Sequence, residues 1–160
     1  MRKLFVGLAA LLMLVVVAQF YFAASGAFST APNEESFRPH RALGYVIFFL
    51  PVLMAIVGAL ARMPGRLIGM AGLVAGLAIV QVLVAVLAKA FNDTGDTTTT
   101  AGQLVFGLHA VNGLAIVAVS GNVLRRARVL AGSAVTGRRA GAGDDAEVPG
   151  AAAGTAQPAS

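Results

Sequence analysis

The sequence contains no cysteine, and its charged residues are few. The absence of cysteine excludes disulfides, Cys-ligated zinc, iron–sulfur clusters and thiol catalysis. Charged residues make up 12% of the 160 residues, about half of the roughly 25% found in an ordinary soluble domain. Hydrophobic residues make up 58%. Most of the chain is therefore unsuited to water, and a lipid-embedded protein is expected.

Charge is missing altogether from four long apolar segments. A helix needs about 20 apolar residues to cross the hydrocarbon core, and the segments that meet this requirement are 4–24, 43–61, 67–88 and 104–124. Their backbones must be helical because lipid offers no partner for free amide groups. The sequence therefore predicts an all-α protein, an up-down four-helix transmembrane bundle over residues 1–128. The remainder, 129–160, is rich in Ala, Gly and Ser without apolar periodicity, which predicts a disordered cytoplasmic tail.

The first apolar segment has two interpretations. Arg2 and Lys3 precede it and small residues follow it, as in a signal peptide. Its uncharged run exceeds the 7–15 residues of a usual signal-peptide core, so we expect a retained helix. No internal repeat is evident in the chain.

Basic residues are distributed unevenly between the two sides of the predicted bundle. One side carries Arg38, Arg41 and Lys89, and the other carries nine residues: Arg2, Lys3, Arg62, Arg66, Arg125, Arg126, Arg128, Arg138 and Arg139. The positive-inside rule places the richer side in the cytoplasm. The protein is then expected in a bacterial cytoplasmic (inner) membrane, with both termini on the cytoplasmic side. Because these residues flank apolar segments, the net charge of +5 indicates membrane topology, and no nucleic-acid partner is expected.

Gly72 and Gly76 form a GxxxG pattern in the third segment. Such a pair lets another backbone approach closely. It serves either internal packing against 43–61 or 104–124, or contact with a second copy or another membrane partner.

A few polar residues lie inside the apolar segments, where burial is costly unless they are satisfied. They are Gln19, Gln81, His109, Asn112 and Asn122. At 1.5 Å per residue, four of them share one layer in the outer half of the bundle, with His40 above it. They either hydrogen-bond one another across helix interfaces or line a binding site.

The two histidines, His40 and His109, are the candidate metal ligands. In an up-down bundle their helices are diagonal, so both imidazoles can reach the bundle axis, where a haem b iron takes axial imidazoles. Gln81 and Asn112 would lie nearby, and Arg38 and Arg41 could pair with haem propionates. Counting from the inner arginines, however, the two histidines differ in depth by about 9 Å. A single-histidine site therefore stays open.

Three short patterns carry a family resemblance. The pairs and triplets His40-Arg41, Gln81-Val82-Leu83 and Leu108-His109-Ala110 resemble one four-helix half of haem A synthase and related b-type cytochrome bundles, over about 35–126. The resemblance implies that His40 and His109 bind iron. Ser36 stands where that family typically has an acidic residue, which argues against haem-oxidising activity. The chain also resembles small four-span membrane proteins of uncharacterised bacterial families.

No catalytic constellation is evident. The sequence has no HExxH, no phosphate-binding glycine loop and no Ser-His-acid set at a common depth. The predicted function is therefore a small multi-pass membrane protein that binds haem b for electron transfer. The alternative is a non-catalytic membrane subunit or partner-binding protein whose polar residues serve helix packing.

Overall fold

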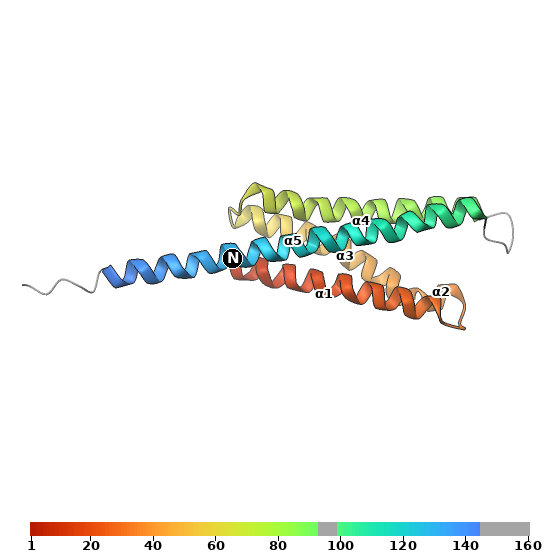
Figure 1. Cartoon of the computed structure of the whole chain (residues 1–160), viewed down its shortest axis with the longest axis horizontal. Coiled ribbons are helices and arrows are strands. Elements are labelled where there is room, and N and C mark those ends of the chain that lie inside the picture. Colours follow the sequence, from red (N-terminus) through yellow and green to blue (C-terminus); the bar gives the residue numbers. More distant parts are fainter. Residues whose placement is uncertain (93–98, 145–160) are drawn as a thin grey trace, which may run out of the picture.

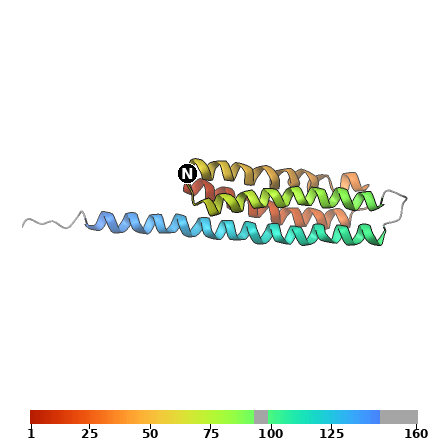
Figure 2. The same ribbon diagram turned by 90° about the horizontal axis from the view of Figure 1, so that it is seen from above.

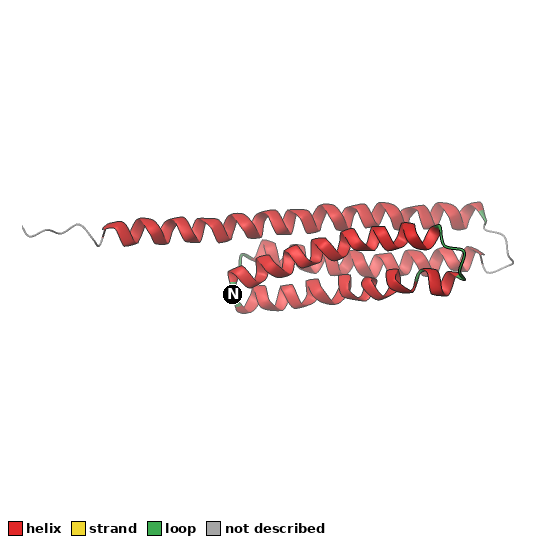
Figure 3. Ribbon diagram, turned by 90° about the horizontal axis from the view of Figure 1, so that it is seen from below, coloured by secondary structure: helices red, strands yellow, loops and turns green. Residues whose placement is uncertain are grey.

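The computed structural model describes the chain at residues 1–92 and 99–144, with side chains at 1–91 and 99–133. Four long helices and one short helix make up these residues, and no strand occurs among them (Figure 3). They are α1 (Arg2–Ala27), α2 (Asn33–Ser36), α3 (Arg38–Leu60), α4 (Gly65–Asn92) and α5 (Thr100–Asp144). The predicted all-α fold is confirmed.

Each long helix is long and apolar enough to cross a membrane. The spans are Arg2–Ala27, Arg38–Leu60, Gly65–Phe91 and Thr100–Ser133, with mean hydropathies between 1.8 and 2.5. Each begins two to five residues before the segment expected from the sequence, because the polar residues at a segment's edge continue the helix in which the apolar run lies. The chain is therefore a multi-pass membrane protein with four candidate spans.

The four long helices form a ring. α1 packs against α3, α3 against α4, α4 against α5, and α5 against α1, whereas the diagonal pairs α1/α4 and α3/α5 do not approach each other closely within the described residues. Neighbouring helices run in opposite directions (Figures 1 and 2). We call the end that carries α2 the α2 end, and the end that carries the short α3–α4 connection the turn end. Toward the α2 end, the α1–α3 pair diverges from the α4–α5 pair (Figure 1).

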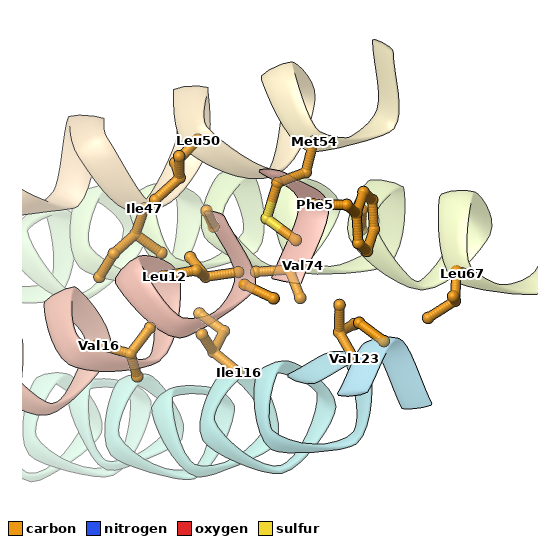
Figure 4. Close-up of a cluster of buried hydrophobic side chains, with 14 of the residues drawn as sticks. Phe5, Leu12, Val16, Ile47, Leu50, Met54, Leu67, Val74, Ile116 and Val123 are labelled. Atoms are coloured by element: carbon orange, nitrogen blue, oxygen red, sulfur yellow. The ribbon is translucent and has the colours of Figure 1, made fainter. Parts of the chain in front are cut away.

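The hydrophobic core fills the half of the bundle nearest the turn end. All four long helices contribute to it (Figure 4), with Phe5, Leu12, Val16, Ile47, Leu50, Met54, Leu67, Val74, Ile116 and Val123 among the buried side chains. Inside a bilayer such a core is stabilised mainly by close packing rather than by transfer from water. α1 supplies Phe5, Leu12 and Val16 to this core. The half near the α2 end is left for polar groups.

The connection between α3 and α4 is a tight turn, as its length predicts. Arg62 adopts a left-handed conformation with φ 50°. Its N–H donates to Ala59 O at 3.0 Å, and the N–H of Met63 donates to Gly58 O at 2.9 Å. These two bonds form the Schellman motif that commonly ends helices. The motif reverses the chain, so that α3 and α4 run antiparallel to each other.

The fourth long helix extends further than the sequence suggested. α5 continues to Asp144, so the tail expected to be disordered from residue 129 is helical over 129–144. Residues 145–160 lie outside the described part of the chain. The extension contains four Ala and two Arg residues, which favour helix, and four Gly residues, which do not, and no proline occurs between residues 129 and 148. The lack of apolar periodicity argues against a helix with one buried face in this segment, but it does not argue against an exposed helix.

The GxxxG pair does not serve internal packing. Gly72 and Gly76 are exposed, and a Cβ added at either would meet no atom within 4 Å. The inner face of α4 is formed by neighbouring residues, Ala71, Val74 and Ala75 among them. The close helix contact therefore uses Ala71-xxx-Ala75, one residue earlier in the chain. This rotates the glycines onto the outer surface of the bundle.

Candidate functional site

His40 lies in the first turn of α3 and is held by Gln19 of α1. Its Nδ1 lies 3.3 Å from the backbone oxygen of Gln19, and its Nε2 lies 3.4 Å from Gln19 Nε2. Because a carbonyl oxygen only accepts, Nδ1 carries the proton in this arrangement, and Nε2 accepts weakly from the amide. The side-chain oxygen Oε1 of Gln19 is buried and has no hydrogen-bond partner among the described residues. The Gln19 amide is thus incompletely satisfied beside the imidazole.

His109 of α5 is held in the same way by Gln81 of α4. Its Nδ1 lies 3.2 Å from the backbone oxygen of Gln81, and Gln81 Nε2 donates to the backbone oxygen of His109 at 2.8 Å. Asn112, one turn further along α5, donates to Gln81 Oε1 and to Leu77 O. Gln81 therefore joins α4 to α5 through reciprocal hydrogen bonds, and its amide is satisfied at both ends.

The two imidazoles meet between the helix pairs. Their ring centroids lie 6.2 Å apart with the planes inclined at 42°, although their helices are diagonal in the ring. Phe37 packs edge-on against His40, and Phe106 stacks on His109. The expected difference in depth does not keep the two rings apart, since their centroids lie 6.2 Å from each other. The α1–α3 pair is inclined relative to the α4–α5 pair (Figure 1), whereas the depth count assumed parallel helices.

The surroundings of the two histidines repeat. We call α1 with α3 the first hairpin and α4 with α5 the second hairpin, and each hairpin contains one of the histidines. Gly44 and Gly113 each follow a histidine by four residues. A Cβ at Gly44 would lie 3.8 Å from Gln19 Nε2, and one at Gly113 would lie 3.5 Å from Gln81 Nε2. In each hairpin the first helix therefore supplies a glutamine, and the second supplies a histidine and the glycine beside that glutamine.

This repeat went unnoticed in the sequence. The ring order and the helix directions are those of two hairpins related by an approximate twofold axis along the bundle. The unequal separations between glutamine and histidine, 21 and 28 residues, hide the correspondence along the chain. The two His-x-x-x-Gly patterns, His40 to Gly44 in α3 and His109 to Gly113 in α5, were the signal that could have revealed it.

The structure brings together some of the predicted site residues and leaves others apart. His40, His109, Gln81 and Asn112 lie in the layer just described. Arg38 is exposed, and the exposed Arg41 donates from its guanidinium to the backbone oxygen of Glu34. No hydrogen bond joins either arginine to a histidine among the described side chains.

Asn122 does not join this layer. Its amide nitrogen donates to Ala118 O of its own helix, and its oxygen accepts from Arg125. Of the five intramembrane polar residues, Asn122 alone bonds entirely within its own helix among the described residues.

The donor set at this site consists of two imidazoles. No group of three or more His, Cys, Asp or Glu residues able to hold a metal ion occurs among the described side chains. A zinc site normally draws three or four protein ligands, whereas a haem iron takes its remaining ligands from the macrocycle and needs only one or two imidazoles.

Comparison with known proteins gives one match. The model of a family of unknown function, DUF6220, matches residues 19–89, less than half of the chain. The matched segment contains Gln19, His40 and Gln81 and stops before His109. No curated protein and no solved structure matches the chain.

Proposed function

We propose that the chain binds one b-type haem between His40 and His109 and acts in membrane electron transfer. The observation that carries this proposal is the convergence of the two imidazoles, 6.2 Å apart between centroids, from diagonal helices. Each Nδ1 faces a backbone carbonyl. Such a bond fixes the tautomer and leaves Nε2 for a metal.

The spacing of the rings fits the proposed ligand pair. Two metal–nitrogen bonds of about 2.0 Å each place coordinating imidazole centroids roughly 6 Å apart. His40 Nε2 is contacted by the Gln19 amide at 3.4 Å, a length at which a hydrogen bond is weak. Rotation of this amide frees the nitrogen at small cost, because its Oε1 has no partner to lose.

The other site residues have distinct roles in this proposal. The backbone oxygens of Gln19 and Gln81 orient the two rings, and Asn112 holds the Gln81 side chain in place. Arg38 and Arg41, exposed at the same end, are available for propionate carboxylates. A haem iron, when bound, supplies one-electron redox chemistry.

The orientation of the protein is part of the proposal. Arg62, Arg66, Arg125, Arg126 and Arg128 lie toward the turn end, whereas Arg38 and Arg41 lie at the α2 end. The positive-inside rule favours a cytoplasmic turn end. We therefore assign the chain to a bacterial inner membrane with the histidine pair in the outer half.

A second candidate function rests on the polar layer itself. The Gln81, His109 and Asn112 bonds join α4 to α5 without any cofactor, and Gly72 and Gly76 face outward. Both features suit a non-catalytic membrane subunit whose polar groups fix the bundle. The exposed glycines would then contact a second copy or another membrane protein.

Visible spectroscopy separates the two candidates. The full chain is expressed with added haem precursor, purified in detergent and scanned before and after dithionite reduction. Ligation by both histidines predicts a low-spin Soret band with sharp reduced bands, and His40→Ala or His109→Ala abolishes that spectrum. If the unmutated protein already gives a high-spin spectrum and His40→Ala leaves that spectrum unchanged, the two-ligand assignment is overturned. The lack of any Soret band in the unmutated protein would overturn haem binding.

The matched control is Asn122→Ala. Asn122 is also a polar residue of α5, but its hydrogen bonds do not reach the histidine layer. Its replacement is expected to leave haem content unchanged. Circular dichroism and size-exclusion chromatography of each variant distinguish loss of ligand from loss of fold.

A further inference from the structure

A second site lies at the turn end, far from the histidines. A cavity of about 440 Å³ opens between the start of α4 and residues 125–130 of α5. Arg66, Arg125 and Arg126 line it together with the apolar side chains of Leu67, Val129 and Leu130. Arg66 stands at the beginning of its membrane span, so the cavity lies where the hydrocarbon core meets the interface.

No acidic side chain among the described residues neutralises the positive charge of this cavity. Among the described side chains the acids are Glu34 and Glu35, which belong to α2 at the opposite end. Arg125 donates to Asn122, which is a neutral group. The Nε of Arg126 is buried and has no hydrogen-bond partner in the described structure. Buried donors in native proteins are normally paired, so this nitrogen lacks an acceptor.

We propose that this cavity binds an anionic phospholipid. The phosphate diester accepts hydrogen bonds from the guanidinium groups, which match phosphate geometry in pairs, and it supplies the acceptor that Arg126 Nε lacks. The first turn of α4 adds the positive end of a helix dipole. One acyl chain runs along Leu67, Val129 and Leu130. Basic pockets between membrane helices commonly hold anionic head groups in this way.

The proposed lipid also has a structural role. It joins α4 to α5 at the end where α5 leaves the bundle, and it neutralises arginines that otherwise repel one another across a small space. A free phosphate ion shares the head-group chemistry but makes no use of the apolar wall. The occupant is therefore a lipid whose head group and chain bind together.

The test uses the full chain in nanodiscs of phosphatidylcholine with 20 mol% phosphatidylglycerol, added as the probe lipid. Native mass spectrometry after release in mild detergent counts retained lipids. Phosphatidylglycerol retention is expected to fall roughly fivefold for each arginine removed in Arg66→Gln and Arg126→Gln, and to stay unchanged in Arg128→Gln. Arg128 is an exposed neighbour outside the cavity lining.

Three results would overturn the proposal. They are retention of phosphatidylcholine and phosphatidylglycerol in the proportions of the nanodisc, equal loss in Arg128→Gln, and displacement of the lipid by millimolar inorganic phosphate without further loss in the cavity variants. The last result would indicate an ion site instead. Circular dichroism of each variant confirms that retention is compared between folded proteins. A Val129→Ala variant keeps the arginines and removes an exposed apolar side chain of the cavity, so it is expected to lower lipid retention while leaving phosphate binding unaffected.

Discussion

Gln19 and Gln81 look equivalent in the sequence, but their replacement by leucine should have opposite consequences. Gln81 makes two side-chain hydrogen bonds, to His109 O at 2.8 Å and from Asn112. Gln19 makes one contact, at 3.4 Å to His40 Nε2, and carries a buried oxygen without a partner. Both histidines keep their Nδ1 bonds in either variant, because those bonds go to backbone oxygens. The comparison of the two variants therefore measures what the glutamine side-chain amides contribute to stability, separately from the backbone bonds to the histidines.

The expected magnitudes follow from these contacts. Interhelical hydrogen bonds in membranes contribute about 0.6 kcal/mol on average and at most about 1.7, so Gln81→Leu should lower the free energy of unfolding by about 1–2 kcal/mol. Gln19→Leu loses one weak bond and also removes an unpaired buried acceptor, whose burial costs about 1–3 kcal/mol. Its free energy of unfolding should be unchanged or slightly higher. Titration of the detergent-solubilised protein with SDS, followed by circular dichroism, measures the free energy of unfolding of both variants. The two variants are compared in the same state of haem occupancy.

A double-mutant cycle sharpens the test. Gln81→Leu combined with Asn112→Leu should show a coupling energy of about 0.5 kcal/mol or more, as is usual for residues in direct contact. Gln19→Leu combined with Asn112→Leu should be additive. Equal destabilisation by the two single glutamine variants would refute the hydrogen-bond assignments and the difference drawn between the two hairpins.

Two further predictions concern packing and the turn. A Cβ at Gly58 would lie 3.2 Å from Cε2 of Phe5, whereas one at Gly72 would meet nothing within 4 Å. Gly58→Val should therefore lower the free energy of unfolding by about 1–3 kcal/mol and Gly72→Val should not, in the same SDS titration. Arg62 holds φ 50°, so Arg62→Gly should raise stability by roughly 1 kcal/mol, while Arg62→Ala should not. A loss of stability in the glycine variant would contradict the left-handed turn.

The bundle was predictable because length and hydropathy act on whole segments. Twenty apolar residues without charge have few alternatives to a membrane helix, so the four spans were found with their ends within five residues, except that the fourth span runs to Ser133 instead of 124. Rotation of each helix was harder to predict. On α4, Ala71 and Gly72 both suit a close contact, and the sequence pattern favoured the glycines. The packing of the other helices selected the alanine face instead.

The polar layer was predicted in outline because burial of Gln81, His109 and Asn112 demands partners. The approach of His40 to His109 was not predictable by counting residues, since the count assumed parallel helices. The inclination between the hairpins depends on side-chain volumes throughout the core, which no local pattern records. The unsatisfied donor on Arg126 depends on the same packing, so the turn-end cavity had no sequence signal of its own.

The repeat of glutamine, histidine and glycine makes the two-helix hairpin the smallest unit of this architecture. Residues 1–60 alone contain one set of the repeat, Gln19, His40 and Gly44. Two such hairpins facing each other would place two copies of His40 where His40 and His109 now lie. Joining both halves in one polypeptide removes the requirement that they stay identical. Leu43 and Asn112 occupy corresponding positions three residues after the histidines, and Asn112 alone supports a glutamine. The two imidazoles therefore have different surroundings, an asymmetry that a symmetric dimer of hairpins does not allow.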